Sequence, residues 1–215
     1  HTLGEEARDP ARVLAPAGPL QLRYEAEVQG EPVVHDPAGI TELPVQQVPQ
    51  TALHFLLPSR YCESDRLTGF AQAQFGGLAQ GHSRVAAICD FIYQRTAYQR
   101  GSTDVRTTAL DVLTDAAGVC RDFAHLGIAL CRAMGIPARY TSAYAWQLDP
   151  PDFHGVFEAY LGGRWYTFDA RHNRPRIGRI LMARGRDATD VAISTSFGTA
   201  WLAQFDVITE EVPGG

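Results

Sequence analysis

The stretch that decides the fold is Gly118-Val119-Cys120-Arg121-Asp122-Phe123-Ala124-His125-Leu126-Gly127-Ile128-Ala129-Leu130-Cys131-Arg132-Ala133-Met134. Its residues are apolar on most sides of a helix, which predicts a helix buried in the centre of the protein. The following Gly135-Ile136-Pro137 ends this helix, because proline has no backbone N–H to donate and fixes the direction of the chain. Gly118 permits a sharp turn into the helix, so we expect Cys120 at its N-terminus.

This position of Cys120 suits a nucleophile. The thiolate is the reactive form of cysteine, and a helix N-terminus stabilises negative charge through its dipole and its free backbone N–H groups. The amide of Cys120 can itself donate to the oxyanion that forms when the thiolate attacks a carbonyl. One residue would then serve as nucleophile and as oxyanion donor.

The residues that follow predict an antiparallel sheet. Segments 138–148 and 153–161 are rich in β-forming residues, with a Pro-rich turn between them. Gly162-Gly163 signals a hairpin that leads into a further strand over 165–169.

Two residues of this hairpin, His154 and Asp169, are candidate partners of Cys120. His154 stands at the start of one predicted strand and Asp169 at the end of the next, so antiparallel pairing brings their side chains together. A carboxylate fixes the orientation of an imidazole ring and stabilises its protonated form, which favours a thiolate opposite it. This is the geometry that a base and its orienting residue require.

Helices are predicted before the central one. Residues 65–75 form a possible short helix, Ser83 is a good N-cap for a second, and Thr107-Thr108 opens a third that runs to Leu113.

Further strands are predicted towards both ends of the chain. Strict alternation over 20–28 predicts a half-buried strand, and the apolar run 52–57 a short buried one. Two more are expected over 190–194 and 201–208, after a long basic loop over 171–187.

Four parts of the sequence together resemble the core of bacterial transglutaminase-like cysteine enzymes: Gly118–Leu126, Gly135–Tyr140, His154 and Trp165–Asp169. The resemblance covers residues 52–198 and keeps the order Cys, His, Asp. It implies an α+β, papain-like fold in which Cys120 is the nucleophile, His154 the base and Asp169 its orienting residue, with no cofactor and no metal.

The resemblance also divides the chain. Segment 20–58 is similar to the tail of the β-rich N-terminal region that many of these bacterial proteins carry. We therefore expect a β-rich N-terminal region over residues 1–58, with a truncated start, and a transglutaminase-like catalytic domain over 59–215.

Two positions depart from the pattern common in this superfamily. Gly155-Val156 follow His154, where Ala-Trp or another aromatic is frequent, and Ala170-Arg171 follow Asp169, where proline is frequent. These differences bear on the wall beside the thiol, and so on the acyl acceptor that the site admits.

The resemblance implies acyl transfer from an amide or peptide through a thioester on Cys120. We favour release by water, as in a cysteine peptidase or amidase, because the sequence identifies no amine site. Transfer to an amine, as in transglutaminases, is the alternative. Two other hypotheses are a zinc site made of Cys120, His125 and His154, which would leave Asp169 without a role, and a noncatalytic binding domain.

Other cysteines and polar residues of the core have structural interpretations. Cys62, Cys89 and Cys131 are expected to be small buried hydrophobes with free thiols. His125 lies about 500° around the helix from Cys120, so it points away from the thiol and is interpreted as a core histidine. Asp122 suits a capping role in the first turn of the helix.

The remaining histidines and one basic run have no specific role in this interpretation. No partner spacing can be interpreted for His35, His54, His82 and His172. Arg171, Arg174, Arg176 and Arg179 form either a solvated face or, beside the proposed site, a surface that favours an acidic substrate.

The composition is that of an ordinary globular protein. Of 215 residues 45% are hydrophobic and 20% charged, and 19 basic against 24 acidic side chains give a net charge of -5. We expect no binding to nucleic acid or membranes, and a peptide or protein amide as the partner. No segment predicts a membrane span or a signal peptide, so the expected location is cytoplasmic. The first residue is His1 rather than Met, which leaves open a removed signal; the sequence does not indicate an oligomeric state.

Overall fold

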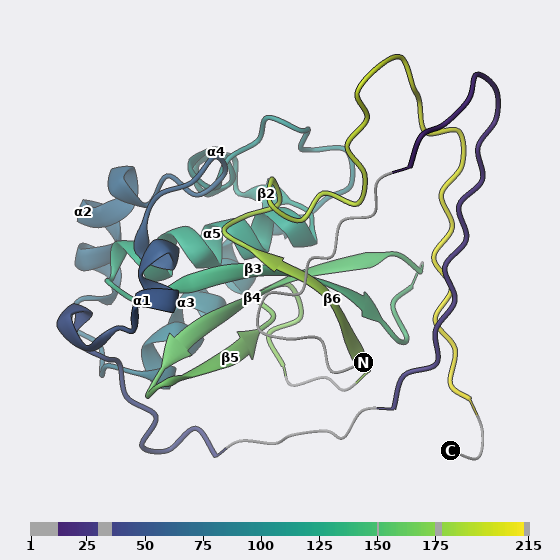
Figure 1. Ribbon diagram of the computed structural model, residues 1–215. Coiled ribbons are helices and arrows are strands. Elements are labelled where there is room, and N and C mark those ends of the chain that lie inside the picture. Colours follow the sequence, from purple (N-terminus) through teal and green to yellow (C-terminus); the bar gives the residue numbers. More distant parts are fainter. Residues whose placement is uncertain (1–12, 30–35, 150, 175–177, 213–215) are drawn as a thin grey trace.

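The computed structural model describes residues 13–29, 36–149, 151–174 and 178–212. A central helix, α5 (Cys120–Ala133), packs against an antiparallel sheet of strand order β5-β4-β3-β6 (Figure 1). The strands are β3 (Ala138–Ala145), β4 (Phe153–Leu161), β5 (Arg164–Phe168) and β6 (Arg179–Gly185). The predicted α+β class, with a central helix on an antiparallel sheet, is confirmed.

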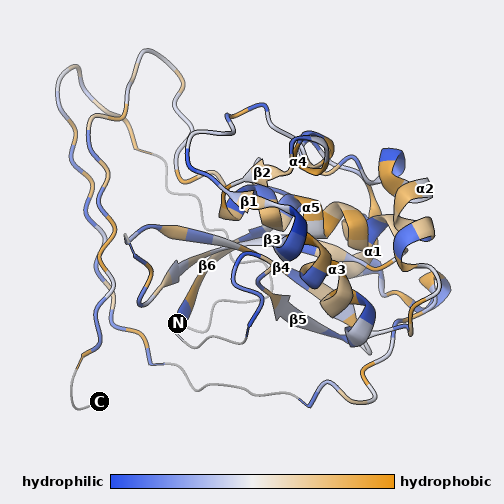
Figure 2. Ribbon diagram, turned by 180° about the vertical axis from the view of Figure 1, so that it is seen from behind, coloured by the Kyte–Doolittle hydropathy of each residue, from blue (hydrophilic) through white to orange (hydrophobic). Residues whose placement is uncertain are grey.

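Helix α5 is buried along nearly its whole length, as the apolar sequence predicts. Viewed from behind, its hydrophobic residues lie between the other helices and the sheet (Figure 2). Gly127 brings the helix close to β4, since a Cβ at this position would lie 2.5 Å from a ring carbon of Phe157. The helix ends before Gly135, whose φ of +79° is a conformation that glycine adopts without strain.

Three helices cover the face of α5 that is turned away from the sheet (Figure 1): α2 (Ser64–Phe75), α3 (His82–Arg95) and α4 (Ala109–Asp115). The predicted cap of α4 is confirmed, because the Thr108 side chain accepts a hydrogen bond from the Asp111 backbone N–H in a capping box. The predicted cap of α3 is wrong. Gly81 holds that position with a φ of +100°, and the Ser83 hydroxyl donates to the Ala79 carbonyl instead.

Two short strands form a small parallel sheet that leads into α5. They are β1 (Ala97–Tyr98) and β2 (Ala117–Gly118). Strand β2 fixes the approach to Cys120. Within the described ranges, no helix combines the length and the apolar character needed to cross a membrane.

The predicted strand over 52–57 is wrong. This segment lies in the helical turns α1 (Gln50–Leu53) and η2 (His54–Leu56), which follow η1 (Val45–Gln47). A short apolar run without alternation does not distinguish a strand from a buried helical turn, and here Pro49 precedes a helical start.

The strands predicted near the C-terminus are also wrong in place. Residues 190–194 and 201–208 form no strand, whereas β6 lies inside the segment expected to be a basic loop. The reason is that the basic residues of β6 have buried partners. Arg184 of β6 donates from Nε to the buried Glu158 of β4 at 2.9 Å, and Glu158 also accepts from Nε of Arg139 in β3 at 2.6 Å. The charge of this strand is therefore compensated across the sheet.

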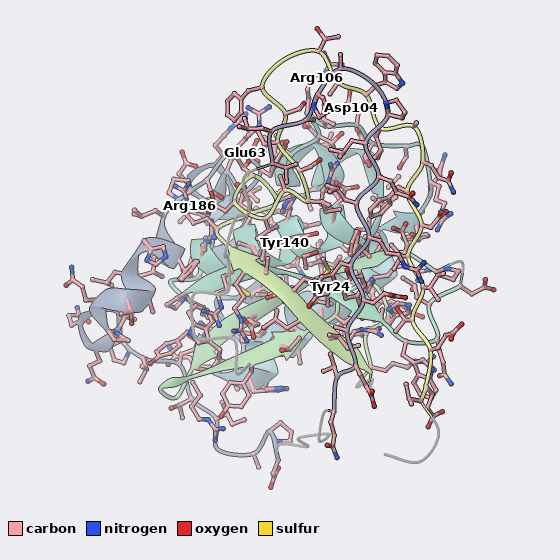
Figure 3. The ribbon with its side chains drawn as sticks, turned by 45° about the vertical axis from the view of Figure 1, so that its right-hand side comes forward. Tyr24, Glu63, Asp104, Arg106, Tyr140 and Arg186 are labelled. Carbon is pink, nitrogen blue, oxygen red and sulfur yellow. The ribbon has the colours of Figure 1, made fainter. Side chains whose placement is uncertain are left out.

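The N-terminal segment is not β-rich where the structure describes it. Residues 13–29 and 36–58 form no strand, while 1–12 and 30–35 lie outside the described residues. Leu22 and Tyr24, which the prediction placed in a half-buried strand, are 72% and 78% exposed. The segment runs beside the C-terminal segment without a ladder between them (Figures 1 and 3). Its residues alternate as in a strand, but no strand among the described residues pairs with it.

Candidate active site

Cys120 is the first residue of α5, as predicted. Strand β2 ends at Gly118, and the Asp122 carboxylate caps the helix by accepting from the Val119 backbone N–H at 2.8 Å. Asp122 is fully buried and also accepts from the Thr103 hydroxyl at 2.7 Å, which confirms the capping interpretation. Gly118 is required here, because a Cβ would lie 2.8 Å from Cβ of Asp122.

The thiol of Cys120 is only partly buried, unlike the other three thiols. Its Sγ lies 4.0 Å from the carbonyl oxygen of Phe153, which immediately precedes His154. The backbone N–H of Cys120 is in the first turn of the helix and makes no backbone hydrogen bond with another described residue. A nucleophilic atom and a free donor therefore lie together at this helix N-terminus.

His154, near the start of β4, and Asp169, just after the end of β5, lie next to each other. His154 Nε2 lies 2.7 Å from Asp169 Oδ2, and His154 is 1% exposed. The register that pairs Phe157 with Phe168 places Asp169, the next residue, near the start of β4. The structure thus brings these two predicted residues together; their catalytic role stays a prediction.

The electrostatics of His154 link it to both other candidates. Burial alone lowers the pKa of His154, but the hydrogen bonds and charges of Asp169 and Cys120 outweigh burial and raise it. Burial likewise raises the pKa of Asp169, yet its pairing with His154 and His172 holds that pKa well below the usual range. The protonated, imidazolium form of His154 is therefore favoured beside the Asp169 carboxylate.

Two partners of Asp169 were not assigned to the site from the sequence. His172 Nδ1 lies 3.0 Å from Asp169 Oδ2, and Arg179 Nη2 lies 3.3 Å from the same oxygen. The backbone N–H of His172 donates to Oδ1 at 3.2 Å. The spacing of three residues between Asp169 and His172 is a signal that could have found this turn. Arg179 comes from β6, which the sequence did not predict.

These contacts correct the interpretation of the basic run. Arg179 is not on a solvated face, because it pairs with Asp169 and is 14% exposed. The guanidinium of Arg171 lies 3.9 Å from the ring centroid of Tyr98. Arg176 lies outside the described residues.

His125 and the other cysteines are structural, as predicted. His125 is fully buried, stacks on Tyr61 at 5.0 Å and accepts the Ala188 backbone N–H at Nε2. Burial lowers its pKa to about 3, so the ring is neutral. Cys62, Cys89 and Cys131 are buried free thiols, and burial raises the pKa of Cys62 to about 12.

The zinc hypothesis finds little support in this arrangement. Among the described residues, Cys120, His125 and His154 do not form a group of metal-type ligands; the group that does form is His154, Asp169 and His172. In that group Asp169 is already bound to both rings and to the cationic Arg179, which disfavours a further cation.

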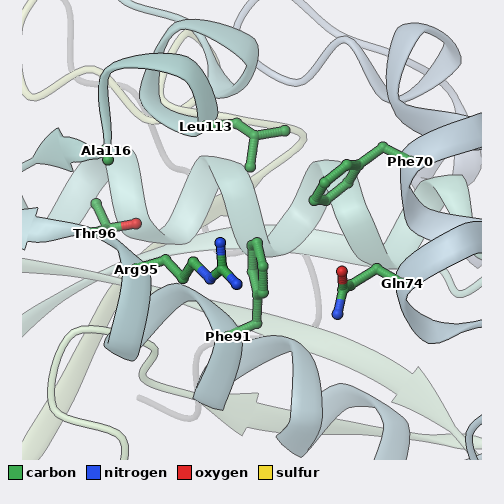
Figure 4. Close-up of a pocket in the computed structure, with 7 residues that line it drawn as sticks. All are labelled: Phe70, Gln74, Phe91, Arg95, Thr96, Leu113 and Ala116. Atoms are coloured by element: carbon green, nitrogen blue, oxygen red, sulfur yellow. The ribbon is translucent and has the colours of Figure 1, made fainter.

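A cavity of about 250 Å³ lies between α2, α3 and the end of α4 (Figure 4). None of the three candidate residues lines it, so we do not assign it to the site. Its lining is Phe70, Gln74, Phe91, Arg95, Thr96, Leu113 and Ala116.

Comparison with known proteins identifies the class. Residues 68–170 match the model of the transglutaminase-like superfamily, a range that includes Cys120, His154 and Asp169. The chain therefore carries a transglutaminase-like domain, and the resemblance stated from the sequence is confirmed.

Individual relatives are similar to parts of this chain. A proposed cysteine protease from Cytophaga hutchinsonii has a solved structure that is 51% identical, with a TM-score of 0.72 over 74% of this chain and 55% of that chain. An uncharacterized protein of Mycobacterium leprae is 32% identical over 62% of this chain and 52% of its own length. An uncharacterized protein of Mycobacterium tuberculosis is 35% identical over 46% of this chain and 37% of its own length. The chain thus spans about half or less of the curated relatives it matches.

Proposed function

We propose that this protein is a cysteine-dependent enzyme that transfers acyl groups from amide or peptide substrates, and that water is its usual acceptor. The observation that carries the proposal is the buried His154, held at 2.7 Å by Asp169 and electrostatically linked to the thiol at the start of α5. The match to the transglutaminase-like superfamily supports acyl transfer, and the similarity to the proposed cysteine protease of Cytophaga favours a peptidase.

The first half of the reaction makes a thioester. Because Nε2 of His154 bonds to Asp169, Nδ1 is the ring nitrogen left to exchange a proton with Cys120. The thiolate attacks the carbonyl carbon, and the C=O π electrons move to oxygen. When the C–N bond breaks, its electron pair leaves with nitrogen, which takes the proton from the imidazolium. The acyl group then remains on Sγ.

The second half of the reaction releases the acyl group and regenerates the free Cys120 side chain. His154, now neutral, takes a proton from water as the water oxygen attacks the thioester carbonyl. The C–S bond breaks, the acid leaves, and the imidazolium faces a thiolate again. If a primary amine takes the place of water, the same steps give a new amide, which is the transglutaminase alternative.

The proposal is tested with a library of fluorogenic peptide amides, assayed with and without a fluorescent primary amine. We expect turnover by the wild-type protein, an acyl adduct on Cys120 by mass spectrometry, and loss of both in Cys120→Ala. Cys131→Ala, which removes a buried thiol outside the site, is the matched control and should keep turnover. Equal turnover by Cys120→Ala and wild type, or no adduct with any library member, would overturn the proposal.

A further inference from the structure

The fold leaves one hydroxyl beside the candidate site without a partner. Tyr140 of β3 is 6% exposed, and its ring packs 5.2 Å from the ring of His125. Its hydroxyl forms no hydrogen bond with any residue in the described ranges. Its oxygen is not among the fully buried unpaired side-chain atoms of the described residues, so it keeps some contact with solvent and is free to donate a hydrogen bond.

The hydroxyl points towards the start of α5. A Cβ on Gly155 would lie 2.5 Å from the Tyr140 oxygen and 3.2 Å from Cα of Arg121. The hydroxyl and the first turn of the helix therefore both border Gly155, the residue after His154. This glycine is one of the departures from the superfamily pattern, and any larger residue would fill the space that the hydroxyl occupies.

Cys120 interacts electrostatically with the phenol of Tyr140. Burial, and next to it the negative charge of Cys120, raise the pKa of Tyr140 far above its usual value. The phenol therefore stays protonated over the whole range in which a cysteine enzyme works. A neutral O–H beside a developing negative charge can donate a hydrogen bond, whereas a phenolate would repel that charge.

We infer that Tyr140 supplies the second oxyanion donor, beside the backbone N–H of Cys120. This inference rests on the proposed function. As Sγ attacks the substrate carbonyl, negative charge forms on the carbonyl oxygen, and the free N–H and the free O–H both border the helix N-terminus where that oxygen must lie. Both donors are in place before substrate binds, which is what makes such donors effective.

The test uses Tyr140→Phe, which removes only the hydroxyl. The expected result is a fall of kcat by about 10- to 1,000-fold with KM changed by less than about threefold. Alkylation by iodoacetamide should keep its rate and pH profile, because that reaction forms no oxyanion. Inhibition by the peptide aldehyde leupeptin should weaken by about the same factor as kcat, since its adduct with a thiol carries an oxyanion.

Thr141→Val is the matched control. The Thr141 hydroxyl lies on the neighbouring residue of the same strand and is buried without a partner, but successive side chains of a strand point to opposite faces. This variant should keep the wild-type kcat and aldehyde affinity. A loss equal to that of Tyr140→Phe would show that any lost hydroxyl in β3 disturbs the site, and would overturn the inference.

The outcomes separate the inference from the proposed function. If wild type and Tyr140→Phe turn over equally, and bind leupeptin equally, only the inference fails. If the wild type itself shows no Cys120-dependent turnover or aldehyde adduct, the proposed function fails as well. Should Tyr140→Phe not fold, Tyr140→3,5-difluorotyrosine keeps the hydroxyl as a stronger donor. Leupeptin affinity must then rise, and an unchanged affinity contradicts the inference.

Discussion

Asp169 and His154 are joined by a hydrogen bond of 2.7 Å between Oδ2 and Nε2, and this carboxylate oxygen serves other donors as well. It also accepts from His172 and pairs with Arg179. The carboxylate that holds the proposed base is therefore itself held, by a turn of its own segment and by an edge strand. Its orientation depends on β4, β5 and β6 together.

Cys120→Ala and His154→Ala should each lower kcat by at least about 1,000-fold while the thermal unfolding temperature changes little. The two residues act as one unit in the proposed reaction, so the double variant should be little worse than either single one. Steady-state kinetics on the best peptide amide measure this. Losses that multiply in the double variant would mean that the two residues do separate jobs.

Asp169→Asn should lower kcat by about 100- to 10,000-fold without abolishing it. Asparagine keeps the size and can still hold the ring, but it removes the charge that stabilises the imidazolium opposite the thiolate. Alkylation of Cys120 by iodoacetamide should accordingly shift to higher pH. Wild-type turnover with an unchanged alkylation profile would show that Asp169 only ends a strand, and the orienting residue would have to be sought elsewhere.

The buried His125 should lower the free energy of unfolding as the solution becomes acidic. Its pKa is about 3 in the folded protein and near 6.5 when unfolded, so the unfolded state binds a proton first. The stability that the neutral ring contributes is complete above pH 6.5 and is lost as pH falls towards 3.

The variant His125→Gln checks this prediction. Its amide oxygen can still accept the Ala188 N–H, but it does not titrate. Urea unfolding at several pH values should give a free energy that depends less on pH between 3 and 6.5 than that of the wild type. Parallel curves for the two proteins would contradict the assignment of the acid sensitivity to this residue.

The sequence predicted the parts of the site that short segments determine. The start of α5 follows from Gly118 and the apolar helix, and the nearness of His154 and Asp169 follows from one hairpin. These features depend on segments that are adjacent in the sequence, where propensity and turn chemistry decide the structure.

The parts that were missed depend on distant pairing. Strand β6 appeared to be a basic loop because the acid that neutralises Arg184, Glu158, lies 26 residues away. Because β6 was not predicted, nothing in the sequence indicated that Arg179 lies beside Asp169. The reverse error occurred over 20–28, where alternation predicted a strand but no described strand pairs with the segment. Hydrophobic periodicity and β propensity indicate that a segment can form a strand, but whether it does depends on a neighbouring strand to pair with.

His172 should tune the base rather than perform the chemistry. It donates to Asp169 by its backbone N–H and contacts Oδ2 with Nδ1, so removing the ring leaves the carboxylate less restrained and its negative charge less shared. His172→Ala should lower kcat by about tenfold, similar to the loss found for residues that orient metal-binding histidines. Because Asp169 then stabilises the imidazolium more strongly, the pKa of His154 should rise, and the pH at which iodoacetamide alkylation changes should move with it. His172→Asn is the control, since its side-chain amide can donate from nearly the position of Nδ1 and should restore most of the rate and the original pH profile. If alanine and asparagine give the same pH profile as the wild type, His172 only closes the turn after β5.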